Sequence, residues 1–303
     1  METSKNEEEK TLQNKIDFAV IFSVNGANPN GDPLNGNRPR TNYDGFGEVS
    51  DVCIKRKIRN RLMEDGHSVF VQSDENRKDE YRSLRSRVEG ELTKEVREDV
   101  NRFKKEACNK WLDVRAFGQV FAYSAEKNEE GVSIGIRGPV SIHSAFSKSR
   151  LEASSLQITK SVNNEDNKKD INKKTSDTMG MKHRVDHGLY VTYGAINPQL
   201  ASKTWFKPED ANAIKNALEH LFDNDVSSAR PEGSMEVVAV FWWQHNVKHG
   251  QYSSAVVHRS LSVDPKDGIT DPKKIENYSI KLKSLAGLEP EIFNPNSVVI
   301  QRI

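Results

Sequence analysis

The stretch Ile16-Asp-Phe-Ala-Val-Ile-Phe-Ser-Val24 alternates large apolar residues with residues that are mostly small or polar. The large apolar side chains stand at every second position: Ile16, Phe18, Val20, Phe22 and Val24. An alternation of period two is typical of a β-strand, because successive side chains point to opposite faces of the sheet. The stretch therefore predicts a first strand with one strongly buried face.

A long segment rich in glycine and proline follows this strand over residues 25–47. It holds five glycines and three prolines, a density that excludes a regular helix or strand. With more than twenty residues it is longer than an ordinary loop. Loops of this length are usually functional, so the segment is a candidate for binding.

The first helix is predicted to begin directly after this loop. Ser50 stands at the N-cap position and Asp51 in the first turn, where both residue types favour a helix start. Ile54, Ile58 and Leu62 then repeat at a spacing of four, before Gly66 ends the pattern. One face of this helix is therefore expected to be buried.

Two insertions separate the later elements. Residues 74–116 predict a long helical insertion, because their apolar residues step by three or four. Residues 148–184 are polar and rich in Lys, Asn and Ser, and they carry too few large apolar residues to fold alone. We interpret this second insertion as an extended arm.

The remaining elements predict the fold class. Strand patterns cover residues 134–146 and 188–196, an amphipathic helix begins at Pro208, and a further strand covers residues 235–247. Without the insertions the order is strand, helix, strand, strand, helix, strand. This α+β order is that of ferredoxin-like domains, which RNA-recognition modules also use. Residues after 264 are expected to form an irregular tail with a terminal strand at 297–303.

Composition excludes several classes of protein. The 303 residues include 45 Lys and Arg against 44 Asp and Glu, so a nucleic-acid surface must be a local patch. The two cysteines form no Cys-x-x-Cys pair, which excludes a disulfide framework and a structural zinc site; a reducing cytoplasm is the default. The longest apolar run, residues 237–243, is too short to span a bilayer. Residues 1–14 are interpreted as a solvated tail.

Positive charge gathers in two segments of this nearly neutral chain. Residues 38–61 hold seven basic and three acidic residues, and residues 148–184 hold nine basic and five acidic ones. Lys55, Arg56 and Arg59 share one arc of the first helix, beside its apolar stripe. Two basic segments that flank one sheet favour a track for a polyanion.

Several motifs together resemble a known family. They are Asn28-Pro-Asn-Gly-Asp-Pro33, Asn35-Gly-Asn-Arg-Pro-Arg40, Gly47-Glu-Val-Ser-Asp-Val-Cys-Ile-Lys-Arg-Lys-Ile-Arg59, Arg137-Gly-Pro-Val140 and Asp177-Thr-Met-Gly-Met-Lys-His-Arg184. In this order they look like the crRNA-binding backbone subunit of type I CRISPR surveillance complexes (Cascade), specifically the type I-C branch. The similarity spans about residues 16–246.

The resemblance implies a single hand-like domain over residues 15–303. Its ferredoxin-like (RRM-like) palm would comprise residues 15–73, 134–147 and 185–303, with helical fingers at 74–133 and an extended β-hairpin thumb at 148–184. Copies would stack head to tail along the crRNA, together with other Cascade subunits, and present the guide for pairing with target DNA. The subunit would be neither an enzyme nor a membrane protein and would need no cofactor or metal.

The resemblance also implies which residues bind the RNA backbone independently of its sequence. Arg and Lys suit this task, because they bind phosphate oxygens without reading bases. Methionines at the end of the arm are candidates for flexible wedges against a base. The full set is Asn28, Asn30, Gly31, Arg38, Arg40, Ser50, Lys55, Arg56, Arg59, Arg137, Met179, Met181, Lys182, His183 and Arg184.

Other interpretations of the sequence are weaker. Asp32 lies in the glycine-rich loop, where related type III backbone subunits carry a cleaving Asp, so the alternative function is a metal-dependent ribonuclease. A Pro-x-Gly-Asp-Pro turn, however, favours an Asp that caps the backbone. His183 with His187, and His245 with His249, are four residues apart in strand or loop patterns, where this spacing does not converge on a metal. A lone RNA-binding protein is a third interpretation, disfavoured by the arm and loop.

Overall fold

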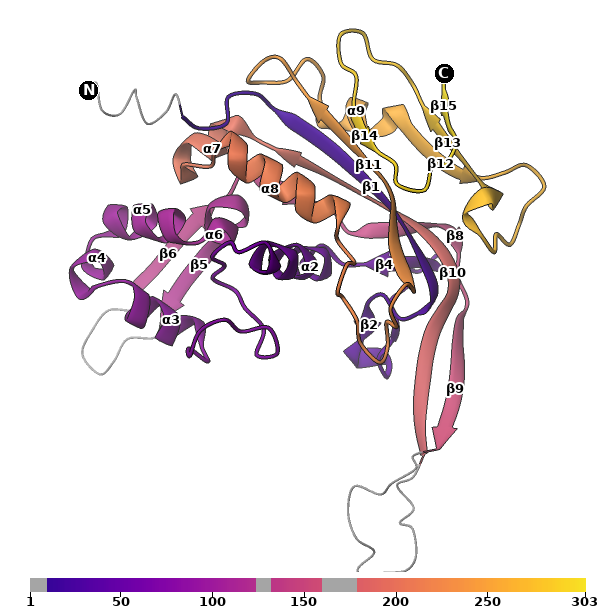
Figure 1. Ribbon diagram of the computed structural model, residues 1–303, viewed down its shortest axis with the longest axis horizontal. Coiled ribbons are helices and arrows are strands. Elements are labelled where there is room, and N and C mark those ends of the chain that lie inside the picture. Colours follow the sequence, from indigo (N-terminus) through magenta and orange to yellow (C-terminus); the bar gives the residue numbers. More distant parts are fainter. Residues whose placement is uncertain (1–9, 124–131, 160–178) are drawn as a thin grey trace, which may run out of the picture.

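The computed structural model describes residues 10–123, 132–159 and 179–303. They form a mixed α/β fold around a large antiparallel sheet (Figure 1). Within the described residues this sheet has eight strands. Its main path is β14-β11-β1-β10-β8-β4, and β7 and β9 also pair with β10. The bounds are β1 (Ile16–Ala27), β4 (Phe46–Val49), β7 (Val140–Ile142), β8 (Ala145–Arg150), β9 (Ala153–Thr159), β10 (Met179–Ile196), β11 (Met235–Gln244) and β14 (Glu291–Phe293).

Strand β1 confirms the prediction from the alternating stretch and lies near the middle of the sheet, between β10 and β11. Its burial differs from the prediction, because both of its faces are covered. Phe18 and Val20 belong to one apolar core, whereas Ala19 and Ile21 belong to a second core on the opposite face. The small and medium side chains between the large ones are therefore also core residues.

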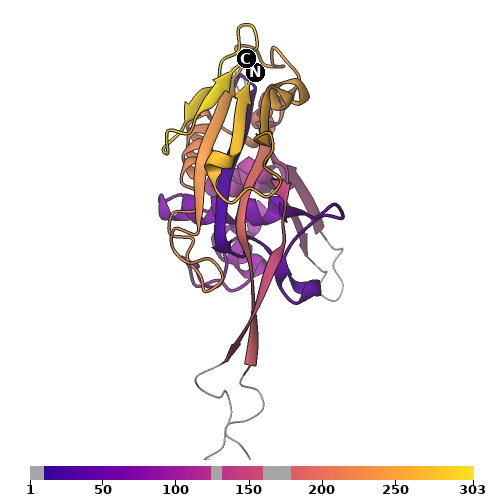
Figure 2. The same ribbon diagram turned by 90° about the vertical axis from the view of Figure 1, so that its right-hand side faces the viewer.

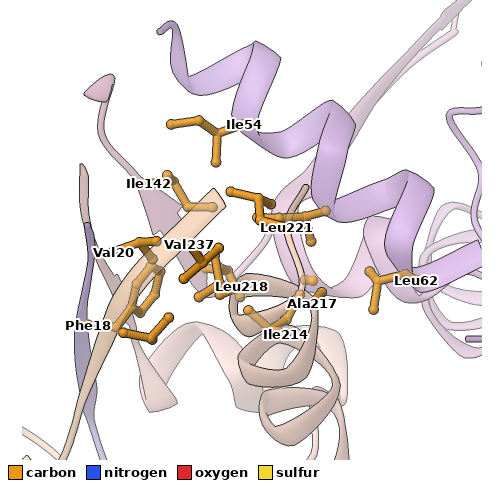
Figure 3. Packing of buried hydrophobic residues seen from close by; sticks show 14 of the residues in the cluster. Phe18, Val20, Ile54, Leu62, Ile142, Ile214, Ala217, Leu218, Leu221 and Val237 are labelled. Atoms are coloured by element: carbon orange, nitrogen blue, oxygen red, sulfur yellow. The ribbon is translucent and has the colours of Figure 1, made fainter. Parts of the chain in front are cut away.

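Two helices cover the first face of the sheet. Helix α2 (Asp51–Glu64) begins where the sequence predicts, and the Ser50 hydroxyl accepts a hydrogen bond from the Cys53 amide as its N-cap. Helix α8 (Pro208–Glu219) follows the short helix α7 (Pro198–Thr204). Figure 3 shows Ile54 and Leu62 of α2 in one apolar cluster with Ile214 and Leu218 of α8. The apolar stripes thus pack helix on helix as well as helix on sheet.

The helical insertion is confirmed, but as four short helices and not one long one. They are α3 (Leu84–Glu91), α4 (Lys94–Glu98), α5 (Val100–Lys110) and α6 (Leu112–Phe117). A separate apolar core forms between them and a two-stranded sheet, β5 (Gly118–Tyr123) with β6 (Val132–Arg137). Phe70, Phe103, Trp111 and Phe121 fill this core. The long apolar pattern therefore reflects packing of several helices around one centre.

The predicted single strand over residues 134–146 was wrong. Residues up to Arg137 belong to β6 and pair with β5 beside the helices, whereas β7 and β8 belong to the main sheet. Gly138 lies between β6 and β7, where the chain passes from the smaller sheet to the main sheet. A Cβ at this position would lie only 2.3 Å from the Ala116 carbonyl oxygen. The residues on both sides of Gly138 alternate as strands do. Only the strands with which they pair, which lie outside this stretch of sequence, assign them to two different sheets.

The C-terminal segment covers the second face of the sheet, which corrects the prediction of an irregular tail. It forms α9 (Ser254–Ser260) and a three-stranded sheet, with the predicted terminal strand present as β15. The strands are β12 (Leu261–Pro265), β13 (Tyr278–Leu282) and β15 (Ile300–Arg302), with the 3-10 helix η2 (Ile275–Asn277) before β13. Val263, Ile280 and Leu282 pack in the second core. Short strands separated by prolines carry too weak a local pattern to be recognised in the sequence.

Two further expectations differ from the structure. Thr11 and Leu12, placed in a solvated tail, are buried, and the Leu12 amide donates to the Phe206 carbonyl oxygen at 2.9 Å. Strand β10 begins at Met179, not near residue 188, and its first half pairs with β9 as a projecting β-hairpin (Figures 1 and 2). The arm residues 160–178 lie outside the described residues, as do residues 1–9. No helix in the described ranges is long and apolar enough to cross a membrane.

Candidate nucleic-acid interface

The glycine-rich loop is a compact, hydrogen-bonded structure. Strands β2 (Gly31–Asp32) and β3 (Arg38–Pro39) pair across the 3-10 helix η1 (Pro33–Asn35). Asp32 Oδ1 accepts a hydrogen bond from the Leu34 amide at 3.2 Å, which is the turn role that the sequence indicates. A Cβ on Gly31 would lie 2.1 Å from Asn37 Oδ1, so a larger residue there would require the Asn37 side chain to move. The loop is therefore pre-shaped before any ligand binds.

Asn30 joins this loop to the start of helix α2. Its Oδ1 accepts from the Ser50 amide at 3.0 Å and from the Ser50 hydroxyl at 2.9 Å, while its carbonyl oxygen accepts from the Arg40 amide. Asn28 is buried and donates to the Asn37 carbonyl oxygen at 2.7 Å. Asn28, Asn30 and Ser50 thus use their side-chain polar groups to hold the loop against the helix.

The three basic residues of helix α2 differ in their surroundings. Lys55 forms an ion pair with Asp51 at 3.0 Å near the surface. Arg56 donates to the Val71 carbonyl oxygen at 2.7 Å, and partial burial and the charge of Arg59 lower its pKa. Arg59 Nε lies 2.8 Å from the fully buried carboxylate of Asp113. All three side chains therefore retain further N–H donors, but only Arg59 is also held by an ion pair with a fully buried carboxylate.

Residues that the sequence did not single out also organise this helix. Asp113 accepts from the amides of Phe70 and Val71 as well as from Arg59. Buried Lys57 pairs with Asp225, and burial lowers its pKa. These carboxylates lie 54 and 168 residues from their partners. No local pattern could have identified them.

Arg38 and Arg40 point from the loop to different places. Arg38 Nη2 donates to the Ser155 hydroxyl of β9 at 2.6 Å, so the loop contacts the base of the projecting hairpin in the same chain. Arg40 lies 3.6 Å from Asp32 and is about one-third exposed. The loop that carries both arginines lies beside the base of the hairpin, at one end of the sheet (Figure 1).

The predicted residues of the hairpin divide between its two faces. Met179, Met181 and His183 alternate on one face of β10, with Lys182 and Arg184 on the other. Both methionines are more than half exposed, which leaves them free to touch a ligand. Arg137 is exposed at the end of β6, in the smaller β5–β6 sheet and not in the main sheet.

The histidine pairs have ordinary hydrogen-bond partners. His183 Nδ1 lies 2.9 Å from the Ser155 hydroxyl, and His187 Nδ1 lies 2.7 Å from Asn25 Oδ1. Buried His245 contacts Asp17 at 2.8 Å, and His249 contacts Gln199. In the parts of the chain that the structure describes, no group of three or more His, Cys, Asp and Glu could hold a metal ion.

The stability of the hairpin base should depend on pH through His187. Burial, and to a smaller extent Lys273, lowers its pKa below the ordinary 6.5, while Glu276 opposes the shift. The unfolded chain then binds a proton at a higher pH than the folded one, so stability is complete above about pH 6.5 and falls below it. The free energy of unfolding, measured in urea from pH 7.5 to 5.5, should decrease for the wild type.

His187→Gln is the matched comparison, because Gln keeps a donor toward Asn25 but does not titrate in this range. We expect a lower stability at pH 7.5 and a smaller loss on acidification. Half-buried His258, whose pKa is also lowered by burial, leaves a residual dependence of stability on pH. Equal pH slopes for the two proteins would contradict the assignment.

Comparison with known proteins gives the family of the chain as a whole. A family model described as CRISPR-associated protein Cas7 matches residues 14–283. The CRISPR-associated protein Cas7 of Haloferax volcanii is 30% identical over 122 residues, 40% of this chain and 36% of that protein. The matched part therefore spans about a third of that relative's length.

Two solved structures are also similar. A chain of a "CRISPR RNA-guided surveillance complex, pre-nicking" gives a TM-score of 0.45 at 14% identity and covers 76% of this chain and 75% of that one. A chain of a "CRISPR RNA-guided surveillance complex" gives a TM-score of 0.39 at 17% identity, with 76% and 68% covered.

Proposed function

The chain belongs to the CRISPR-associated protein Cas7 family, and from this premise we propose that it is a non-catalytic backbone subunit that binds crRNA in a CRISPR surveillance complex. The family match over residues 14–283 confirms the resemblance seen in the sequence and is the observation that carries this function. The loop, the start of helix α2 and the projecting hairpin meet at one end of the sheet, which supports a continuous binding surface there.

We propose a hand-like organisation for this subunit. The palm is the ferredoxin-like sheet, and the order β11-β1-β10-β8 with α2 and α8 on one face supports it. The fingers are the helices α3 to α6 with the β5–β6 sheet, which have a core of their own. The thumb is the hairpin of β9 and β10. Copies of the subunit, other subunits of a type I-C complex and target DNA paired to the guide are the proposed partners.

The RNA contacts that we propose are to phosphates. Lys55, Arg56, Arg38 and Arg40 lie at the loop and the adjoining helix, and Lys182 lies on the hairpin. Their ammonium and guanidinium groups bind phosphate oxygens without reading bases, as a subunit that serves any guide requires. Asn28, Asn30 and Ser50 act by holding the loop in shape.

Assembly on RNA tests the proposed function. A single-stranded guide has a direction, so identical copies along it are related by one repeated screw operation. The mass of the complex should therefore grow in steps with guide length, for guides of unrelated sequence. Mass photometry on guides of increasing length is the measurement, with DNA duplexes of equal length as the control. A dimer of fixed mass on every guide would contradict the proposal.

A further inference from the structure

A cavity of about 560 Å³ lies in the C-terminal part of the chain, between the start of β11, strand β13 and the segment that leads into β15. Its volume falls within the range of about 300–1,000 Å³ that is common for binding pockets. The described lining includes none of the residues that we propose to bind RNA. The cavity is therefore distinct from the candidate nucleic-acid interface.

The cavity forms where the chain before β15 turns away from β13. Strand β15 pairs with β13 at residues 280–282, whereas residues 278–279 pair, within the described ranges, only with β12. Asn294 fixes the turn, because its side chain accepts from the Val298 amide and donates to the Val298 carbonyl oxygen, both at 2.9 Å. Ser297 completes the turn in the left-handed region, at φ +50°. A built turn thus keeps one edge of β13 open beside the cavity.

Much of the lining is apolar. Buried Tyr278 and Ile280, half-buried Ile275 and Val298, and Val299, which is 78% exposed, all contribute to it. Removal of apolar area from water is favourable, so a ligand with apolar side chains gains free energy by covering Val298 and Val299.

The charges of the lining favour a cation. Glu236 and Glu276 line the cavity, and neither has an ion pair in the part of the chain that the structure describes. Half-buried Glu236 accepts from the Ser23 hydroxyl and from Asn296 Nδ2, both at 3.1 Å, but these neutral donors leave its negative charge uncompensated. Lys266 also lines the cavity but is exposed, so solvent screens its charge.

We propose that this cavity docks an extended segment of a partner protein in which an arginine or a lysine lies between apolar residues. The cation pairs with Glu236 and Glu276, and its apolar neighbours cover Val298 and Val299. The open edge of β13 suits an extended chain, because a peptide can add to a free sheet edge through main-chain hydrogen bonds. Nucleic acid is disfavoured, since its phosphates would face two carboxylates. The inference goes beyond the proposed function, because the site needs no RNA.

A designed peptide tests the site. The probe is the fluorescein-labelled peptide Ser-Val-Arg-Val-Ser, and the same peptide with glutamate in place of arginine is the ligand control. Fluorescence anisotropy with the full-length chain should show saturable binding of the arginine peptide. The glutamate peptide should bind at least about tenfold more weakly, because it loses the charge-assisted contacts.

Variants of the two carboxylates locate the binding. Glu236→Gln/Glu276→Gln keeps an acceptor toward Ser23 and should weaken binding of the arginine peptide by about tenfold or more. Glu276→Gln alone changes only an exposed side chain and should still weaken binding about threefold. The matched control is Glu75→Gln/Glu80→Gln, which neutralises two exposed carboxylates before α3, far from β13 (Figure 1), and should leave the affinity unchanged.

The outcomes separate this inference from the proposed function. Glu236→Gln/Glu276→Gln should bind guide RNA like the wild type, and Lys55→Ala/Arg56→Ala should bind the arginine peptide like the wild type. No saturable peptide binding, equal binding of the two peptides, or equal losses in the cavity and control variants would overturn the docking site and leave RNA binding intact. A chain that binds the arginine peptide but no guide RNA would overturn the proposed function alone.

Discussion

Binding of guide RNA by the Lys55→Ala/Arg56→Ala variant is expected to be about 100-fold weaker than binding by the wild type. Each charge-assisted contact contributes roughly 1.5 kcal/mol or more, so two contacts sum to about 3 kcal/mol. Fewer counterions are then released on binding. The slope of log affinity against log salt concentration should become smaller in magnitude by about 1.4, because each lost phosphate contact removes about 0.7. Fluorescence anisotropy with short guides across a salt series measures both quantities.

The matched control for this variant is Lys281→Ala/Lys283→Ala. It removes two positive charges from exposed positions in and directly after β13, on the C-terminal sheet. Its salt slope should equal that of the wild type, because β13 lies far from β2 of the glycine-rich loop (Figure 1). An unchanged slope for the helix variant, or a loss confined to one guide sequence, would contradict a phosphate contact.

The Asp113→Ala variant is expected to lose about 3–5 kcal/mol of unfolding free energy, the range typical of breaking a buried ion pair. The fully buried carboxylate accepts from Arg59 and from the amides of Phe70 and Val71. Alanine leaves all three donors without this partner while they stay largely shielded from water. Urea denaturation followed by circular dichroism measures the loss.

Glu98→Ala is the control for Asp113→Ala, because the one ion pair of Glu98 among the described residues is a well-exposed pair with Lys94. Its unfolding free energy should change by less than about 1 kcal/mol. Guide affinity per folded molecule should change less for Asp113→Ala than for Lys55→Ala/Arg56→Ala. A loss below about 1 kcal/mol in Asp113→Ala would show that Arg59 is not held by this carboxylate.

Predictions that depend on local pattern agree with the structure. Strand β1, helix α2 with its Ser50 cap, helix α8 and strand β11 lie where the residue spacing places them. Hydrophobic period and capping chemistry act over a few residues, so one window of sequence contains the whole signal. The turn role of Asp32 is of the same kind, because its partner Leu34 is two residues away.

The candidate site was only partly predictable for the same reason. The motifs identified the loop, helix and arm that meet at one end of the sheet, and the family match supports them. The motifs could not separate Lys55, which remains near the surface, from Arg59, which is bound to buried Asp113. Both have the same charge and nearly the same helical position, and only the partner differs.

The order of the central elements, the family and the two basic segments could all be established from the residues alone. Tertiary contacts were needed to show that β6 leaves the main sheet, that the C-terminal strands cover its second face, and that Leu12 is buried. They also show which face of the hairpin receives Arg38. Periodicity in the sequence indicates whether a face of a strand or helix is apolar or polar. The residues that cover this face lie far along the chain, so no short stretch of sequence identifies them.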